Sequence, residues 1–177
     1  KVGLLLKTYK ENYTMEECKQ IKKEIEVLKK ELGLSHYPKV YIYPYSLNKQ
    51  NMNRLHSTGN CFVTATRGEG WNVALSEAML FGKPVITPRF GGLSEYLTDD
   101  MACLLSGKME QVHGMNHVPW YDSSQKWLEV DEEKLRGAMR WCYDFQDKAK
   151  GMGQKGQDFV IKNLNLLQIG NKMVDRL

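Results

Sequence analysis

The sequence predicts an α/β protein whose core is a doubly wound parallel sheet. Two observations lead to this fold class. Short apolar runs alternate along the chain with longer segments in which apolar residues recur every three or four positions. The runs are also continuously apolar, as strands covered by helices on both faces usually are. Strands that alternate with helices in this way form βαβ units, and their strands lie parallel in a sheet.

Local signals place the first elements of the chain. Val2 to Leu6 is a short apolar run and is expected to be a buried strand. Thr14 and Glu17 have the spacing of a capping box, which begins a helix, and Gly33 ends that helix. The next three segments are expected to be a strand, a short polar helix and a strand, over residues 39–43, 48–56 and 60–65.

The remaining elements follow a glycine-containing loop at residues 66–70. The pattern predicts a helix over 72–81, a strand over 84–87, a loop with a short helix over 90–95 and a strand over 101–105. The alternation is then lost over residues 106–130, where glycine, proline and serine are scattered between aromatic residues. Helical periodicity returns at Asp131, and Gly151, Gly153 and Gly156 are expected to lead into a closing helix. We therefore expect a single domain over 1–177, with a core at 1–105, an irregular insertion at 106–130 and C-terminal helices at 131–177.

Length, charge and cysteine spacing exclude several classes of protein. A chain of 177 residues can bury the core of one domain. No apolar run approaches the roughly 18–20 residues that span a bilayer. The net charge of +4 is compatible with anionic ligands but does not require nucleic acid. The cysteines lie far apart without a C-x-x-C pair, so free thiols in a reducing, cytoplasmic compartment are expected at Cys18, Cys61, Cys103 and Cys142.

The residues that follow the expected strands are candidates for ligand binding, because ligands of open parallel sheets bind beyond the carboxyl ends of the strands. These residues are Lys7, Lys10, Tyr45, Arg67, Glu69, Trp71, Arg89 and the pair Gly91-Gly92. Basic side chains and helix N-termini together favour phosphate. Lys7 directly follows a buried strand, although an ordinary strand-end lysine has the same pattern.

Several common site motifs are absent. Gly68-Glu69-Gly70 begins like a dinucleotide fingerprint, but Val73 stands where the third glycine should be. The sequence contains no Walker loop and no G-x-S-x-G nucleophile motif. It also lacks a D-x-D pair that would hold a divalent ion on a sugar diphosphate, so no metal is expected.

Two glutamates remain as candidates, Glu69 in the glycine loop and Glu77 near the second turn of the following helix. Helical side chains lean toward the N-terminus, which would bring the Glu77 carboxylate toward the ligand edge. A carboxylate there is suited to accept two hydrogen bonds from a ribose diol. Glu69 is suited to contact sugar hydroxyls or a developing positive charge. A surface helical glutamate and an anion at a helix N-terminus explain the two positions equally well.

The segment Thr64-Ala-Thr-Arg-Gly-Glu-Gly-Trp-Asn-Val-Ala-Leu-Ser-Glu-Ala-Met-Leu-Phe-Gly-Lys-Pro-Val-Ile86, followed by Gly91-Gly92-x-x-Glu95, resembles a known pattern. It is similar to the E-x(7)-E segment of retaining GT-B glycosyltransferases, the family that includes sucrose and glycogen synthases. The shared features are the glycine-aromatic pair after Glu69, the E-A-M helix, the G-x-P-V turn and the G-G-x-x-E loop. The resemblance covers most of residues 1–105 and implies a Rossmann-like domain, the C-terminal half of a GT-B fold.

The resemblance also implies roles for individual residues. Glu77 would bind the donor ribose and Glu69 would contact the transferred sugar as the catalytic carboxylate. Lys7 would neutralise the diphosphate leaving group, where the family often has arginine. The position of the family's second basic residue is occupied by Asn12 or Tyr13 in this sequence. Lys10, which lies nearby, is therefore an uncertain substitute for it. The backbone that would cradle the diphosphate or hexose lies at Gly70, Trp71, Asn72 and Val73, where Asn72 replaces a frequent glycine but tolerates the left-handed conformation.

The resemblance predicts a glycosyltransferase donor domain that transfers a sugar from a nucleoside diphosphate sugar, with retention and without metal or other cofactor. The acceptor would bind an N-terminal domain outside this chain, and the start at Lys1 without Met is expected to mark a cut between the domains. The isolated domain is then expected to be inactive. Two alternatives stay open: a nucleotide-binding module without transfer activity, and a domain that binds nucleic acid or a membrane surface. Lys22 and Lys23 alternate with Glu24 and Glu26, so the charge pattern of this helix favours neither alternative. We expect no nucleic acid partner. A peripheral membrane contact stays open.

Overall fold

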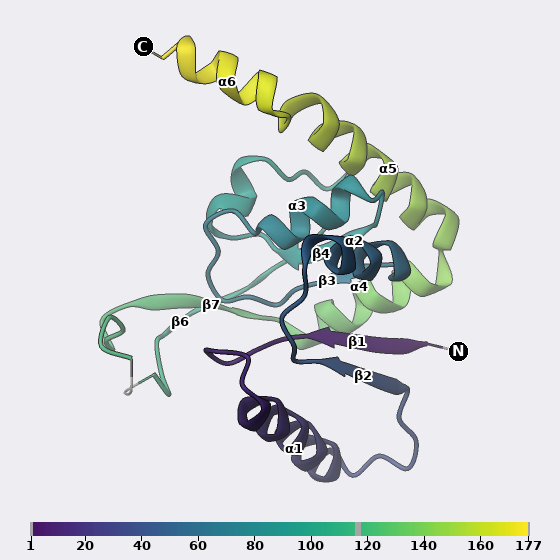
Figure 1. Ribbon diagram of the computed structural model, residues 1–177, viewed down its shortest axis with the longest axis vertical. Helices are drawn as coiled ribbons and strands as arrows, with labels where there is room; N and C mark the ends of the chain where they lie inside the picture. The colour runs from purple at the N-terminus through teal and green to yellow at the C-terminus, as the bar shows by residue number, and fades with distance from the viewer. Residues whose placement is uncertain (1, 116–117, 177) are drawn as a thin grey trace. The chain divides into compact units, whose positions relative to one another are not determined.

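The computed structural model describes residues 2–115 and 118–176, which form two compact units, Lys1–Leu55 and His56–Leu177 (Figure 1). Each unit is described by itself below. Whether residues 1–177 act as one domain stays a prediction. Among the described residues, no helix combines the length and apolar character needed to cross a membrane.

The first unit is a two-stranded parallel sheet with one long helix. Strand β1 (Gly3–Lys7) pairs with β2 (Lys39–Tyr43), and α1 (Met15–Leu32) connects them. The predicted capping box is confirmed: the Thr14 hydroxyl accepts from the Glu17 amide at 3.2 Å, and the Glu17 carboxylate accepts from the Thr14 amide at 3.0 Å. The expected burial of β1 is not observed, because Leu4 and Leu5 each keep 37% of their surface exposed and Leu6 is only half-buried.

The second unit contains a three-stranded parallel sheet in the order β3-β4-β5. Its strands are β3 (Phe62–Val63), β4 (Val85–Pro88) and β5 (Cys103–Leu105). Its helices are α3 (Val73–Leu80), α4 (Glu132–Asp144), α5 (Gln146–Asn163) and α6 (Leu166–Val174), with a 3-10 turn η1 (Gly91–Glu95) after β4. Helix α2 (Lys49–Thr58) precedes β3 and extends across the boundary between the two units.

Strand β4 is buried on both faces, as the continuous apolar pattern predicts. Val85 packs in a cluster with side chains of α3 and α5, and the next residue, Ile86, packs in a second cluster with side chains of α4. Successive residues of a strand point to opposite faces, so helices cover both faces of this sheet. All strand pairs among β1 to β5 are parallel, which confirms the predicted α/β class with parallel strands and helices.

Two expectations are corrected in the C-terminal part. The segment 106–130 is not irregular throughout: β6 (Gly107–Gln111) and β7 (Lys126–Val130) form an antiparallel ribbon, while residues 116–117 between them lie outside the described residues. Gly151, Gly153 and Gly156 do not precede the closing helix but lie inside α5. The prediction of free thiols is confirmed, since all four cysteines are unpaired.

Candidate functional site

The loops after β3 and β4 meet through their backbones. The Gly92 amide donates to the Glu69 carbonyl at 3.0 Å. A Cβ atom on Gly92 would lie 1.6 Å from the Gly70 carbonyl oxygen, and one on Gly91, whose φ is +63°, would lie 2.4 Å from the Glu69 oxygen. Only glycine permits this approach. The glycine pair therefore holds the backbone of Glu69 and Gly70 at the start of α3.

Helix α3 begins with an unusual cap. Asn72 has φ 59° and ψ 76°, and its side chain accepts from the Leu75 amide at 2.9 Å. The expectation that asparagine would accept the left-handed conformation here is thereby confirmed. Asn72 thus joins the glycine loop to α3, and the first amides of the helix, beginning at Val73, are separated from Gly70 and Trp71 in the chain by Asn72 alone.

An aromatic stack fixes the same loop from the side of η1. The rings of Trp71 and Tyr96 lie 4.5 Å apart at 22°, and the Tyr96 hydroxyl donates to the Trp71 carbonyl at 3.0 Å. Tyr96 also stacks on Phe159 of α5. Burial raises the pKa of Tyr96, which keeps this hydroxyl a donor. No sequence motif marks Tyr96, whose only signal is an aromatic residue directly after the G-G-x-x-E loop.

Glu77 lies in the second turn of α3, and its side chain is 41% exposed. Its Oε2 atom lies 3.4 Å from Nε2 of His56, whose side chain is only 6% exposed. The His56 ring stacks on Phe81, with ring centres 6.0 Å apart at 13°. His56 is not among the residues predicted from the sequence, because a histidine near the end of a short polar helix carries no motif.

The basic candidates lie in the first unit. Lys7 ends β1, and its Nζ atom lies over the rings of Tyr13 at 4.9 Å and Tyr9 at 5.7 Å. Burial lowers the pKa of Lys7. The Lys10 ammonium contacts the Glu24 carboxylate of α1 at 2.6 Å. Lys7 therefore lies against two aromatic rings, whereas Lys10 is already paired with a carboxylate.

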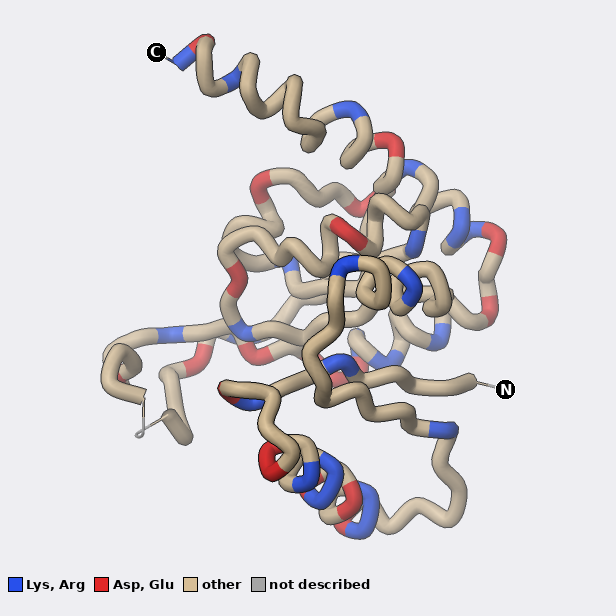
Figure 2. Tube along the Cα trace, in the orientation of Figure 1, with Lys and Arg blue, Asp and Glu red and all other residues tan. Residues whose placement is uncertain are grey.

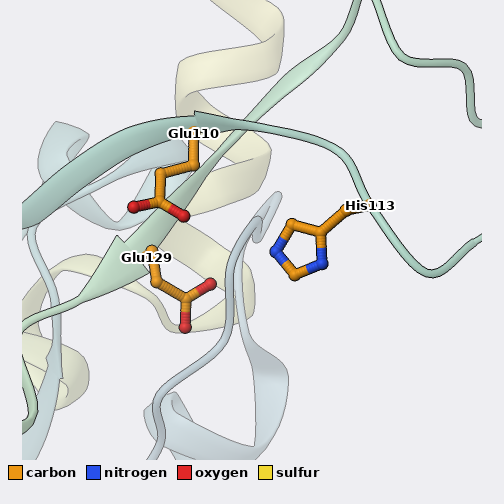
Figure 3. A group of neighbouring side chains, drawn as sticks. All are labelled: Glu110, His113 and Glu129. Atoms are coloured by element: carbon orange, nitrogen blue, oxygen red, sulfur yellow. The ribbon is translucent and has the colours of Figure 1, made fainter.

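One group of side chains could hold a metal. The ligand atoms of Glu110, His113 and Glu129 lie within 4.8 Å of one another on the ribbon, where the three side chains converge (Figure 3). However, Arg67 donates two hydrogen bonds to Glu129, at 2.6 and 3.1 Å, and its guanidinium lies over the Trp127 ring. This fixed cation competes with a metal for the Glu129 carboxylate. Arg67, which lies in the loop after β3, is thus paired with Glu129 of β7.

Comparison with solved structures defines the class of fold. The chain is similar to HepE of Anabaena in complex with UDP, with 15% identity and a TM-score of 0.67, over 99% of this chain and 40% of that one. It is also similar to sucrose-phosphate synthase of Thermosynechococcus elongatus, with 20% identity and a TM-score of 0.69, over 97% of this chain and 37% of that one. The C-terminal domain of the group 1 glycosyl transferase LpcC of Francisella tularensis is also similar, with 18% identity and a TM-score of 0.59, over 83% of this chain and 64% of that one. The fold is that of the Rossmann-like C-terminal domains of GT-B glycosyltransferases, as predicted.

The family follows from the sequence itself. Residues 16–113 match the model of the family described as Glycosyl transferases group 1, and the chain belongs to this family. No curated protein sequence matches the chain significantly. The chain spans about two fifths of the length of HepE and of sucrose-phosphate synthase, at 40% and 37%.

Proposed function

We propose that this chain is the donor-binding part of a glycosyltransferase of the E-x(7)-E type, which transfers a sugar from a nucleoside diphosphate sugar to an acceptor. The observation that carries the proposal is the backbone contact of Gly92 with Glu69, which fixes the loop between the two glutamates. Family membership supports sugar transfer, and the complexes of HepE with UDP and with UDP-glucose make these ligands the first to test.

In this proposal Glu77 and the backbone at the start of α3 bind different parts of the donor. The half-exposed Glu77 carboxylate accepts from the ribose hydroxyls. The backbone of Gly70, Trp71, Asn72 and Val73 receives the diphosphate or the hexose, since the first amides of a helix lack intrahelical partners and the dipole there is positive.

Glu69 and Lys7 act on the reacting bond. When the nucleoside diphosphate departs, negative charge grows on the phosphate. A lysine ammonium stabilises such charge, which is the role assigned to Lys7, and a helix N-terminus does so as well. The sugar becomes oxocarbenium-like, a state that the Glu69 carboxylate favours. Transfer with retention and without metal fits this arrangement, and Lys10 has only a minor part because Glu24 already pairs with it.

The remaining partners are proposals as well. The acceptor would bind an N-terminal GT-B domain of the same protein. Lysines and glutamates alternate along α1 rather than forming a surface of one sign, which argues against a nucleic acid partner (Figure 2). A cytoplasmic location and a peripheral membrane contact remain predictions.

A calorimetric titration of the full-length protein with UDP and UDP-glucose tests donor binding. Glu77→Gln should weaken binding about 10- to 100-fold, roughly 1.4–2.7 kcal/mol, because it loses charged hydrogen bonds to ribose. Glu31→Gln, which removes an exposed carboxylate of α1, is the matched control and should leave the affinity unchanged. Equal affinity of Glu77→Gln and the unsubstituted protein would sink the ribose assignment.

A second candidate function is a nucleotide-binding module without transfer activity. Two observations favour this candidate. Lys10 is paired with Glu24, and Asn12 and Tyr13 stand where the resemblance expects the second basic residue, so that of the two lysines assigned to the diphosphate by the resemblance only Lys7 is left without a carboxylate partner among the described residues. A transfer assay separates the two. An active enzyme should lose at least 100-fold in kcat with Glu69→Gln and keep its UDP affinity within a few-fold. Donor binding without any transfer would establish the module.

A further inference from the structure

His56 is buried beside the glutamate that the proposed function assigns to ribose. It lies in α2, its side chain is 6% exposed, and its Nε2 atom is 3.4 Å from Glu77 Oε2. No hydrogen bond to Nε2 is formed among the described residues. A buried polar nitrogen without a hydrogen bond is costly, so its neighbour at 3.4 Å is the group to consider first.

Aromatic rings hold the imidazole in place. Phe81 stacks on it at 6.0 Å, and the Phe62 ring lies 6.2 Å away at 36°. Phe81 directly follows α3, and Phe62 begins β3, so the ring is held by the same elements that carry the site. These two phenylalanine rings restrict rotation of the imidazole, which keeps its Nε2 atom on the side of Glu77.

The two side chains differ in exposure in a way that suggests distinct roles. His56 is too buried to reach a ligand, whereas Glu77 is half-exposed and can do so. A carboxylate has two oxygens and accepts several hydrogen bonds. If one oxygen is bound from behind, the other is oriented toward solvent, where a diol would approach.

We propose that His56 is a positioning residue, which donates a hydrogen bond from Nε2 to Oε2 of Glu77 and so orients Oε1 toward the ribose hydroxyls of the donor. The inference rests on the proposed function of Glu77. The separation of 3.4 Å shortens to hydrogen-bond length when the ligand is bound, as such contacts often do. His56 orients the carboxylate before binding, which reduces the entropy lost when the nucleotide is bound.

The test compares UDP with 2′,3′-dideoxyuridine diphosphate, because a positioning role acts only on the ribose hydroxyls. The full-length protein should bind UDP at least about 10-fold more tightly than the dideoxy ligand. His56→Phe keeps an aromatic ring but removes the donor, and should abolish most of this preference while leaving dideoxy binding unchanged. His56→Gln, whose amide can replace the imidazole N–H, should restore part of the preference.

Two further variants separate positioning from stability. Leu105→Ala opens a cavity in the second buried cluster, in which no residue of α2 or α3 is found among the described residues, and should lower the unfolding temperature without changing the preference for UDP. On a Glu77→Gln background, His56→Phe should have no further effect on the preference, because the group that it orients is gone.

The possible failures are distinct. If the full-length protein binds neither UDP nor any other ribonucleoside diphosphate, the proposed function fails and the role of His56 falls with it. If it prefers UDP and both His56→Phe and His56→Gln keep that preference, only the role of His56 is overturned. Should His56→Phe not fold, His56→Leu takes its place because leucine also lacks a donor, and an undiminished preference for UDP in that variant would overturn the role of His56 alone.

Discussion

At Gly92 the absence of a side chain decides whether the loops after β3 and β4 can meet. A Cβ atom there would lie 1.6 Å from the Gly70 carbonyl oxygen, and backbone cannot yield as a flexible side chain can. We expect Gly92→Ala to lower the free energy of unfolding by about 1–3 kcal/mol, the range found for overpacking. Gly68→Ala, where a Cβ atom meets nothing within 4 Å, should stay within about 0.5 kcal/mol. Urea denaturation measures both, and equal losses would contradict the close approach.

Arg67 and Glu129 predict a pH dependence of stability. The hydrogen bonds from Arg67 lower the pKa of Glu129 from its usual 4.5. A carboxylate whose pKa is lowered by folding stabilises the protein above its unfolded pKa, and this contribution is lost as the pH falls through the folded pKa. Both side chains are more than a third exposed, at 45% and 38%, so solvent screens the pair. We expect Glu129→Gln to cost about 0.5 kcal/mol at pH 7 and nothing below the folded pKa.

Urea denaturation of Glu129→Gln and the unsubstituted protein from pH 7 to pH 2 checks this sign. The difference should also shrink in 1 M salt, where the Debye length is about 3 Å. A difference that grows as the pH falls would contradict the assignment.

Individual residues could be predicted where a motif or a backbone requirement marks them. Asn72 was expected to adopt the left-handed conformation and does, with φ 59°. His56 and Tyr96 could not be predicted, because their roles arise from packing against residues far away in the sequence. His56 meets Glu77 and Tyr96 meets Trp71 only after α2, α3 and η1 are assembled.

Helix α5 contains glycines with opposite demands. A Cβ atom on Gly153 would lie 2.3 Å from the Gly82 carbonyl oxygen, at the turn between α3 and β4, whereas one on Gly151 would meet nothing within 4 Å. We expect Gly153→Ala to destabilise the protein by about 1–3 kcal/mol. Gly151→Ala should stabilise it by about 0.5–1 kcal/mol, because alanine is the better helix former. Thermal unfolding measures both, and the same sign in both variants would refute the close packing of α5 on this turn.

Elements were predictable where their signals are local. Capping residues fixed both ends of α1, and Asp131 caps α4 through two backbone amides, as the return of periodicity there suggested. The ribbon of β6 and β7 was missed for a physical reason. Most of β6 is exposed, and Trp127 and Leu128 of β7 are adjacent yet both buried, so no two-residue alternation marks either strand.

Across the whole molecule, burial is distributed unevenly between the two units. Among the described residues, the buried apolar side chains of residues 1–55 are Cys18, Ile21 and Pro44, while all others belong to residues 56–177. A two-stranded sheet is marginally stable unless other elements cover it. Lys7 at the end of β1 therefore lies in the unit with fewer buried side chains, whereas Glu69 and Glu77 lie in the better packed unit, residues 56–177.

Native-state hydrogen exchange should therefore divide the chain at this boundary. Amides of β4, whose residues Val85 and Ile86 are fully buried, should exchange only through global unfolding. Amides of β1 and β2 should open locally and exchange at least about 100-fold faster after correction for intrinsic rates, a difference of roughly 2.7 kcal/mol. Saturating UDP should slow exchange near Glu69 and Glu77 if the proposed donor site is correct. Equal protection of β1 and β4 would instead mean that the two units unfold as one cooperative whole.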